Sequence, residues 1–76
     1  MNADRRKQLR GLLADAEHLT AQLEILRDEE QECYDNMPES LQDGERGQNA
    51  QTVIDTLESA VSSSEEAKSY IEEAMA

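Results

Sequence analysis

The chain has 76 residues, with 18 acidic and 7 basic side chains, a formal net charge of −11, and two tyrosines as its only aromatic residues. This length allows one small domain, and the many helix-forming residues, few glycines and single proline exclude a strand-based fold. The negative charge argues against direct binding of nucleic acid or an anionic membrane, because both attract a positive surface.

The first predicted element is a helix over residues 3–35, with Asn2 or Asp4 as its cap. Its apolar positions alternate in steps of three and four, which is the a/d pattern of a coiled-coil seam. The predicted seam consists of Leu9, Leu12, Ala16, Leu19, Leu23, Leu26, Glu30, Cys33 and Met37. Glu30 is its one charged member, and it either pairs with Arg27 or Arg46 or remains in water.

A connector is predicted over residues 37–43, because Pro38 disfavours helical backbone at the residue before it and is itself well placed at the start of a new helix. One helical turn is expected around Glu39–Gln42, with Leu41 folding back under the end of the bundle. The polar cluster that follows, which includes Gly44 and Gly47, is typical of a turn into the next helix.

The second long helix is predicted over residues 44–75, and its apolar stripe is two residues wide. Two helices of similar length joined by a short connector predict an antiparallel hairpin. The predicted register places Ala16 opposite Ser64. The predicted core, shared with a dimer contact, consists of Leu19, Leu23, Leu26, Ile54, Leu57 and Val61. Two helices cannot bury so wide a stripe, so we expect a homodimeric four-helix bundle; a monomeric hairpin and a longer coiled coil are the alternatives.

Candidate catalytic and metal-binding residues are few. His18 falls at a polar heptad position and is expected on the surface, while Cys33 is expected as a small packed side chain. The acid-rich run at residues 28–39 lacks the glycine that a calcium loop needs, since Cys33 stands in its place. No glycine-rich phosphate loop, zinc-ligand spacing or catalytic triad is present. We therefore expect a protein that is not an enzyme and has no cofactor or metal.

The acidic residues of the first helix form a row away from the predicted seam. The row consists of Glu17, Glu24, Asp28, Glu32, Asp35 and Glu39. Side chains four residues apart on a helix are about 6 Å apart, which is similar to the spacing of phosphates along one DNA strand. Such a row can imitate a nucleic-acid backbone and bind a basic protein, although a solvated helix face has the same composition. The candidate partner-binding residues are Glu24, Asp28, Glu32, Tyr34, Asp35 and Glu39.

The stretch at 28–47, "DEEQECYDNMPESLQDGERG", and the helix that continues at 50–67, "AQTVIDTLESAVSSSEEA", resemble a family of short proteins from bacteriophages, prophages and other mobile elements. Members of that family combine a Leu-rich N-terminal helix, a "DEEQ-x-x-YDN-x-PE-x-LQ" segment and an acidic C-terminal helix. The resemblance implies a phage or mobile-element origin and action in the host cytoplasm. By analogy with small acidic phage proteins, which are often inhibitors, we expect the inhibition of a host defence or nucleic-acid-binding protein. It assigns no activity to individual residues. The alternative function is a structural or assembly coiled-coil module.

Overall fold

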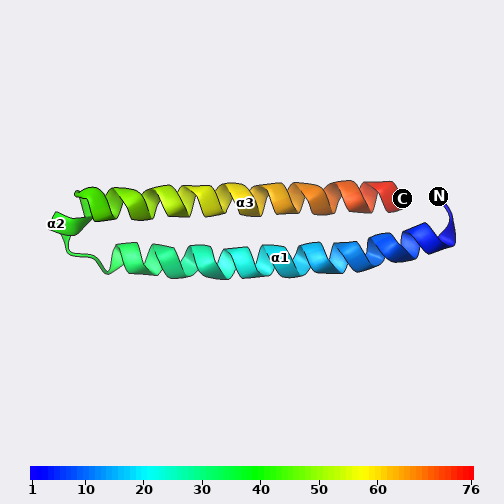
Figure 1. Ribbon diagram of the computed structural model, residues 1–76, viewed down its shortest axis with the longest axis horizontal. Helices are drawn as coiled ribbons and strands as arrows, with labels where there is room; N and C mark the ends of the chain where they lie inside the picture. Colours follow the sequence, from blue (N-terminus) through cyan, green and yellow to red (C-terminus); the bar gives the residue numbers. More distant parts are fainter.

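The computed structural model describes all 76 residues and is a hairpin of two long helices (Figure 1). The helices are α1 (Ala3–Asp35), the short α2 (Glu39–Gln42) and α3 (Glu45–Met75). α1 and α3 lie side by side and run in opposite directions, α2 lies at one end, and both termini lie at the other end (Figure 1). The hairpin is 58 Å long. The predicted all-α hairpin is confirmed.

The helix ends follow from local residues. The side-chain oxygen of Asn2 accepts a hydrogen bond from the backbone N–H of Arg5 at 2.8 Å and caps α1. Asn36 ends α1, and Pro38 precedes the single turn of α2, whose Leu41 and Gln42 N–H groups donate to the Pro38 carbonyl. The expected helical turn is therefore present. The prediction that Leu41 folds back under the bundle end is wrong, because this side chain is exposed.

The connector is held tightly against both long helices. The Gln42 side-chain amide donates to the Tyr34 carbonyl at 2.9 Å, which ties α2 to the last turn of α1. Gly47 is buried in the first turns of α3, and a Cβ atom built on it would overlap the backbone of Gln42. The connector can approach α3 this closely only because position 47 has no side chain.

The contact between α1 and α3 is a seam of residues in steps of three and four on each helix. On α1 and the turn after it the seam residues are Leu9, Leu13, Ala16, Thr20, Leu23, Arg27, Glu30, Tyr34 and Met37, with Glu24 half-buried beside them. On α3 they are Gly47, Ala50, Ile54, Leu57, Val61, Ser64, Lys68, Ile71 and Met75, with Ala60 half-buried beside them.

The predicted α1 seam is therefore half correct. Leu9, Ala16, Leu23, Glu30 and Met37 belong to both the predicted and the observed seams. The other predicted members are exposed, with Leu12 at 53%, Leu19 at 52% and Leu26 at 50%, and Cys33 is exposed as well. The residues that replace them are Leu13, Thr20, Arg27 and Tyr34, each one position further along the chain. Apolar patterning alone cannot find this seam, because two of its four new members are polar or charged.

At the middle of the hairpin a hydroxyl pair bridges the two helices. The Thr20 and Ser64 hydroxyl oxygens are 2.7 Å apart and buried, and each also lies within hydrogen-bond distance of a carbonyl of its own helix, Ala16 or Val61. The two hydroxyl groups have two protons for these three contacts. One hydroxyl therefore donates its proton to the other hydroxyl across the seam, and not to the carbonyl of its own helix. Thr20, and not Ala16 as predicted, lies opposite Ser64, which shifts the register by about one helical turn.

The buried core of the single hairpin is small. Ala50, Ile54 and Val61 are its only buried apolar side chains, and no large side chain is fully buried. Of the predicted core residues, Ile54 and Val61 are buried, and Leu23 and Leu57 are half-buried. Since apolar burial must offset the conformational entropy of 76 ordered residues, a core this small gives a hairpin with little stability of its own.

Candidate interaction surfaces

The hairpin has two long sides, one on each flank of the seam. On α1, one of these sides is bordered by the residues directly before seam positions 13, 20, 27 and 34. Because the helices are antiparallel, the same side is bordered on α3 by the residues directly before seam positions 54, 61, 68 and 75. We call this side the open face. It consists of Leu12, Leu19, Leu26 and Cys33 on α1 and Val53, Ala60, Ala67 and Ala74 on α3.

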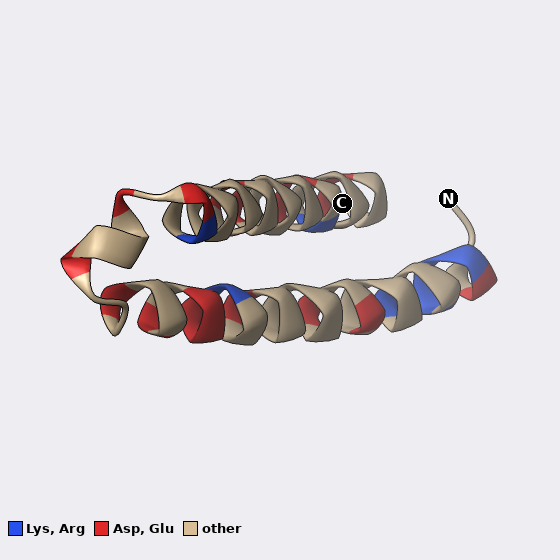
Figure 2. Cartoon of the chain, turned by 60° about the vertical axis from the view of Figure 1, so that its left-hand side comes forward, with Lys and Arg blue, Asp and Glu red and all other residues tan.

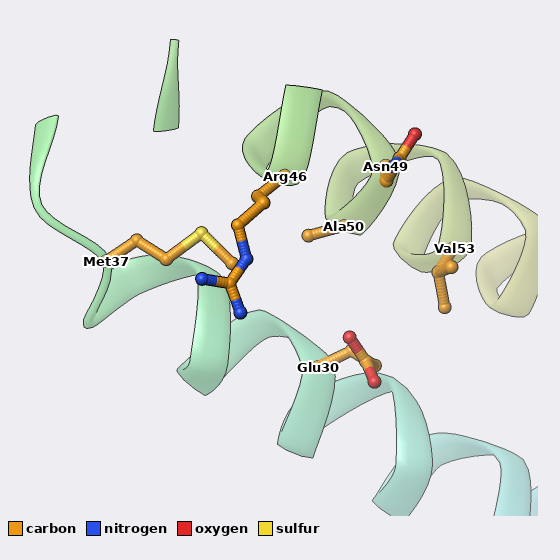
Figure 3. Close-up of a pocket in the computed structure, with 6 residues that line it drawn as sticks. All are labelled: Glu30, Met37, Arg46, Asn49, Ala50 and Val53. Atoms are coloured by element: carbon orange, nitrogen blue, oxygen red, sulfur yellow. The ribbon is translucent and has the colours of Figure 1, made fainter. Parts of the chain in front are cut away.

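The open face is apolar along most of its length. Within α3, the residues at its outer edge are uncharged: Asn49, Thr56, Ser63 and Tyr70. A shallow pocket lies on this side near the connector (Figure 3), between Glu30 and Met37 of the α1 end and Arg46, Ala50 and Val53 of α3. The shared pocket places Val53 of α3 on the same side as Glu30 of α1, as the heptad positions require.

The opposite flank, which we call the acidic side, carries carboxylates from both helices. It consists of Glu17, Glu24, Asp28 and Asp35 on α1 and Asp55, Glu58, Glu65 and Glu72 on α3. Figure 2 shows most of the basic residues at the free end of α1 and mainly acidic residues among the charged positions along the remainder of that helix. The hairpin thus separates an apolar side from an acidic side.

The predicted partner-binding residues do not all share one surface. Asp28, Glu32, Asp35 and Glu39 are exposed, and Glu24 is half-buried beside the seam. Tyr34 is a seam residue: its hydroxyl accepts a hydrogen bond from the Gln51 side chain at 3.0 Å, and its carbonyl accepts one from Gln42. The structure therefore gives Tyr34 a role in joining α1, α2 and α3.

Almost all the acidic residues are free of ion pairs. The single salt bridge joins Arg27 and Asp28 at 3.1 Å. Glu30, which the sequence places in the seam, is half-buried and forms no salt bridge, although the Arg46 side chain reaches into the same pocket (Figure 3). Of the two alternatives for Glu30, the salt bridge with Arg27 or Arg46 is not formed, and the seam opens at this position.

The remaining candidate residues are isolated. His18 is exposed, as predicted, whereas the prediction of a packed Cys33 is wrong because the thiol lies on the open face. No three side chains of the metal-binding types come together. Neither long helix has an apolar stretch of the length required to cross a membrane.

Comparison of the chain with models of known protein families, with curated proteins and with solved structures finds no match.

Proposed function

We propose that this chain is a non-enzymatic interaction protein that binds a basic protein through its acidic side. The observation that supports this most directly is the row of carboxylates on one flank of the hairpin, opposite the apolar open face. Eight carboxylates line one flank, between residues 17 and 35 of α1 and residues 55 and 72 of α3, and only Asp28 among them is in a salt bridge. Exposed carboxylates that lack internal partners are available to a complementary basic surface.

The target class follows from the geometry of this charge. Two helices side by side carry two rows of carboxylates, and a surface that binds the phosphates of nucleic acid is the kind of basic surface that such rows match. The resemblance to short phage and mobile-element proteins suggests a host defence or nucleic-acid-binding protein as the target, met in the host cytoplasm. The proposed mechanism is competition with nucleic acid for that basic surface.

The test is capture from bacterial lysate with the purified chain as bait, at low and at moderate salt, followed by mass spectrometry. A nucleic-acid-binding protein that is retained at low salt, released at moderate salt and displaced by double-stranded DNA supports the proposal, because ionic contacts are screened over about 10 Å at 0.1 M salt. A partner that resists both salt and DNA contradicts it.

A matched pair of variants locates the contact. The first variant combines Glu24→Gln, Asp28→Asn and Asp35→Asn on the acidic side. The second combines Asp43→Asn, Glu66→Gln and Glu73→Gln elsewhere and changes the net charge by the same amount. Loss of capture in the first variant alone supports the acidic side as the contact. Equal loss in both would mean that only the total charge matters.

A second candidate function is an assembly module with no inhibitory role. It is favoured by a different observation, the exposed leucine row of the open face. The two candidates differ in the same capture experiment, since an assembly module would depend on the leucines and be insensitive to the three acidic-side changes.

A further inference from the structure

The open face has the residue pattern of a helix that packs against two neighbours. A helix pair needs apolar residues at two positions in every seven, whereas a helix inside a bundle needs a third on one flank. In α1 the third position is filled by Leu12, Leu19 and Leu26, and in α3 by Val53 and three alanines. Each of the three leucines is half exposed in the hairpin.

The α3 part of the open face differs from the rest of that helix because it carries no carboxylate. The residues at the outer edge of the face on α3 are all uncharged, and all seven carboxylates of α3 lie elsewhere on the helix. A contact made through the open face would therefore remove no α3 carboxylate from water, which would otherwise be costly, and the same edge of α1 carries only two carboxylates, Asp15 and Glu29. Such a contact would also add apolar burial to a core with only three buried apolar side chains.

We propose that the open face is covered by a second copy of this chain, with the two connectors at opposite ends of a four-helix bundle. The size of the face is sufficient for a stable dimer. The hairpin measures 58 by 14 Å along and across its length, a footprint of about 800 Å², which is the area that each partner buries in a standard interface.

Charge distribution determines the relative direction of the two copies. Residues 21–60, the half with the connector, hold 11 acidic and 2 basic side chains, a net charge of −9. Residues 1–20 and 61–76, the half with the free ends, hold 7 acidic and 5 basic side chains, a net charge of −2. Connectors at the same end would place −9 beside −9. Connectors at opposite ends place each −9 half beside the −2 half that carries Arg5, Arg6, Lys7 and Arg10, which lowers the repulsion.

This arrangement also determines which helices meet. A twofold axis across the middle of the face packs α1 against α1 of the second copy and α3 against α3, each pair antiparallel. The leucine rows then meet each other, and the alanine rows, with their short side chains, let the two α3 helices approach closely. Both acidic sides remain on the outside of the bundle.

Two neighbouring residues give a matched test of the contact. Ile25 and Leu26 are each 50% exposed, but Leu26 belongs to the open face whereas Ile25 points away from both the seam and the open face. Sedimentation of the full chain should give twice the 8.5 kDa chain mass for the wild type and for Ile25→Glu. Leu26→Glu should weaken the dimer by about 100-fold or more, since each dimer loses two buried leucines.

The outcomes are separable. A wild-type chain that is monomeric at high concentration overturns the proposal, as does equal weakening by the two substitutions or a Leu26→Glu chain that stays dimeric. Loss of helix in Leu26→Glu beside a folded, dimeric Ile25→Glu supports it, because Leu26 is outside the intramolecular seam and matters only if the second copy covers it. A wild-type monomer that instead captures a different protein on this face also overturns the proposal.

The direction of the second copy is tested with spin labels on Cys33, the single cysteine. If the α1 residues of the open face, from Leu12 to Cys33, overlap fully with those of the second copy, the axis passes between residues 22 and 23. The two labels are then separated by about 32 Å along the bundle, at 1.5 Å per residue. Connectors at the same end would bring them to the same level, within about 20 Å at a helix spacing near 10 Å. A long distance in a labelled protein that sediments as a dimer supports opposite ends, and a short one overturns them.

Discussion

The close approach of the connector to α3 makes the two helical glycines, Gly11 and Gly47, respond oppositely to the same substitution. Gly11 lies on an exposed part of α1 with no atom within 4 Å of the position that a Cβ would occupy. At Gly47 the Cβ would overlap the backbone carbonyl of Gln42, which is not a flexible group. In both cases alanine improves helix propensity by about 1 kcal/mol, so the difference between the two variants reports on packing alone.

We expect Gly11→Ala to raise the free energy of unfolding by about 0.5–1 kcal/mol. Gly47→Ala must move the connector, at an overpacking cost of about 1–3 kcal/mol, and we expect a net destabilisation of up to about 2 kcal/mol after the propensity gain. Since 1 kcal/mol corresponds to about 4–8 °C in a domain of this size, the two Tm values should differ by about 10 °C. Thermal unfolding followed by far-UV circular dichroism, at equal protein concentrations, measures this. A Gly47→Ala variant as stable as Gly11→Ala would refute the packed connector.

Three further changes test other contacts. Thr20→Val or Ser64→Ala alone should cost about 1 kcal/mol in urea unfolding, whereas the double variant should cost less than the sum of the two, because either single change already removes the hydrogen bond between the two hydroxyls; additive effects would contradict the buried pair. Asn2→Ala should lower the free energy of unfolding by about 1 kcal/mol, measured by thermal unfolding, because the cap on α1 is lost. Asn49 does not cap a helix, so Asn49→Ala is the control. Gln42→Ala should increase amide hydrogen exchange in α2 and the last turn of α1 while leaving the middle of both long helices unchanged; uniform exchange would show that Gln42 does not hold the connector.

The helix boundaries and the connector follow from residues whose effects are local. Asn2, Pro38 and Gly44 act on the backbone within a few positions of themselves, so their consequences can be predicted from the chain alone. The single turn Glu39–Gln42 and the ends of α1 and α3 match the prediction to within about one residue because these signals do not depend on what packs against them.

The seam could be predicted only in part, because α1 carries two overlapping seams. Leu12, Leu19 and Leu26 continue the regular apolar series, but the hairpin instead turns Leu13, Thr20 and Arg27 toward α3. The buried Thr20 hydroxyl contacts both the Ala16 carbonyl and the Ser64 hydroxyl opposite it, and the second of these contacts depends on the register between the two helices. The signal that could have separated the two seams is the row of leucines at every seventh residue, which is the pattern expected of the second contact that we propose.

The open face and the acidic side are compatible within one assembly. A second copy on the open face buries leucine and alanine and leaves every α3 carboxylate of both chains in water, so the dimer would present one acidic side on each of its two outer surfaces. Two copies of a weak ionic contact on one rigid body raise the effective concentration of the second contact after the first has formed. Leu26→Glu therefore also bears on the proposed function. If a target is bound by both acidic sides at once, the monomeric variant should lose capture although its acidic side is unchanged. If one acidic side is sufficient, capture should survive the loss of the dimer.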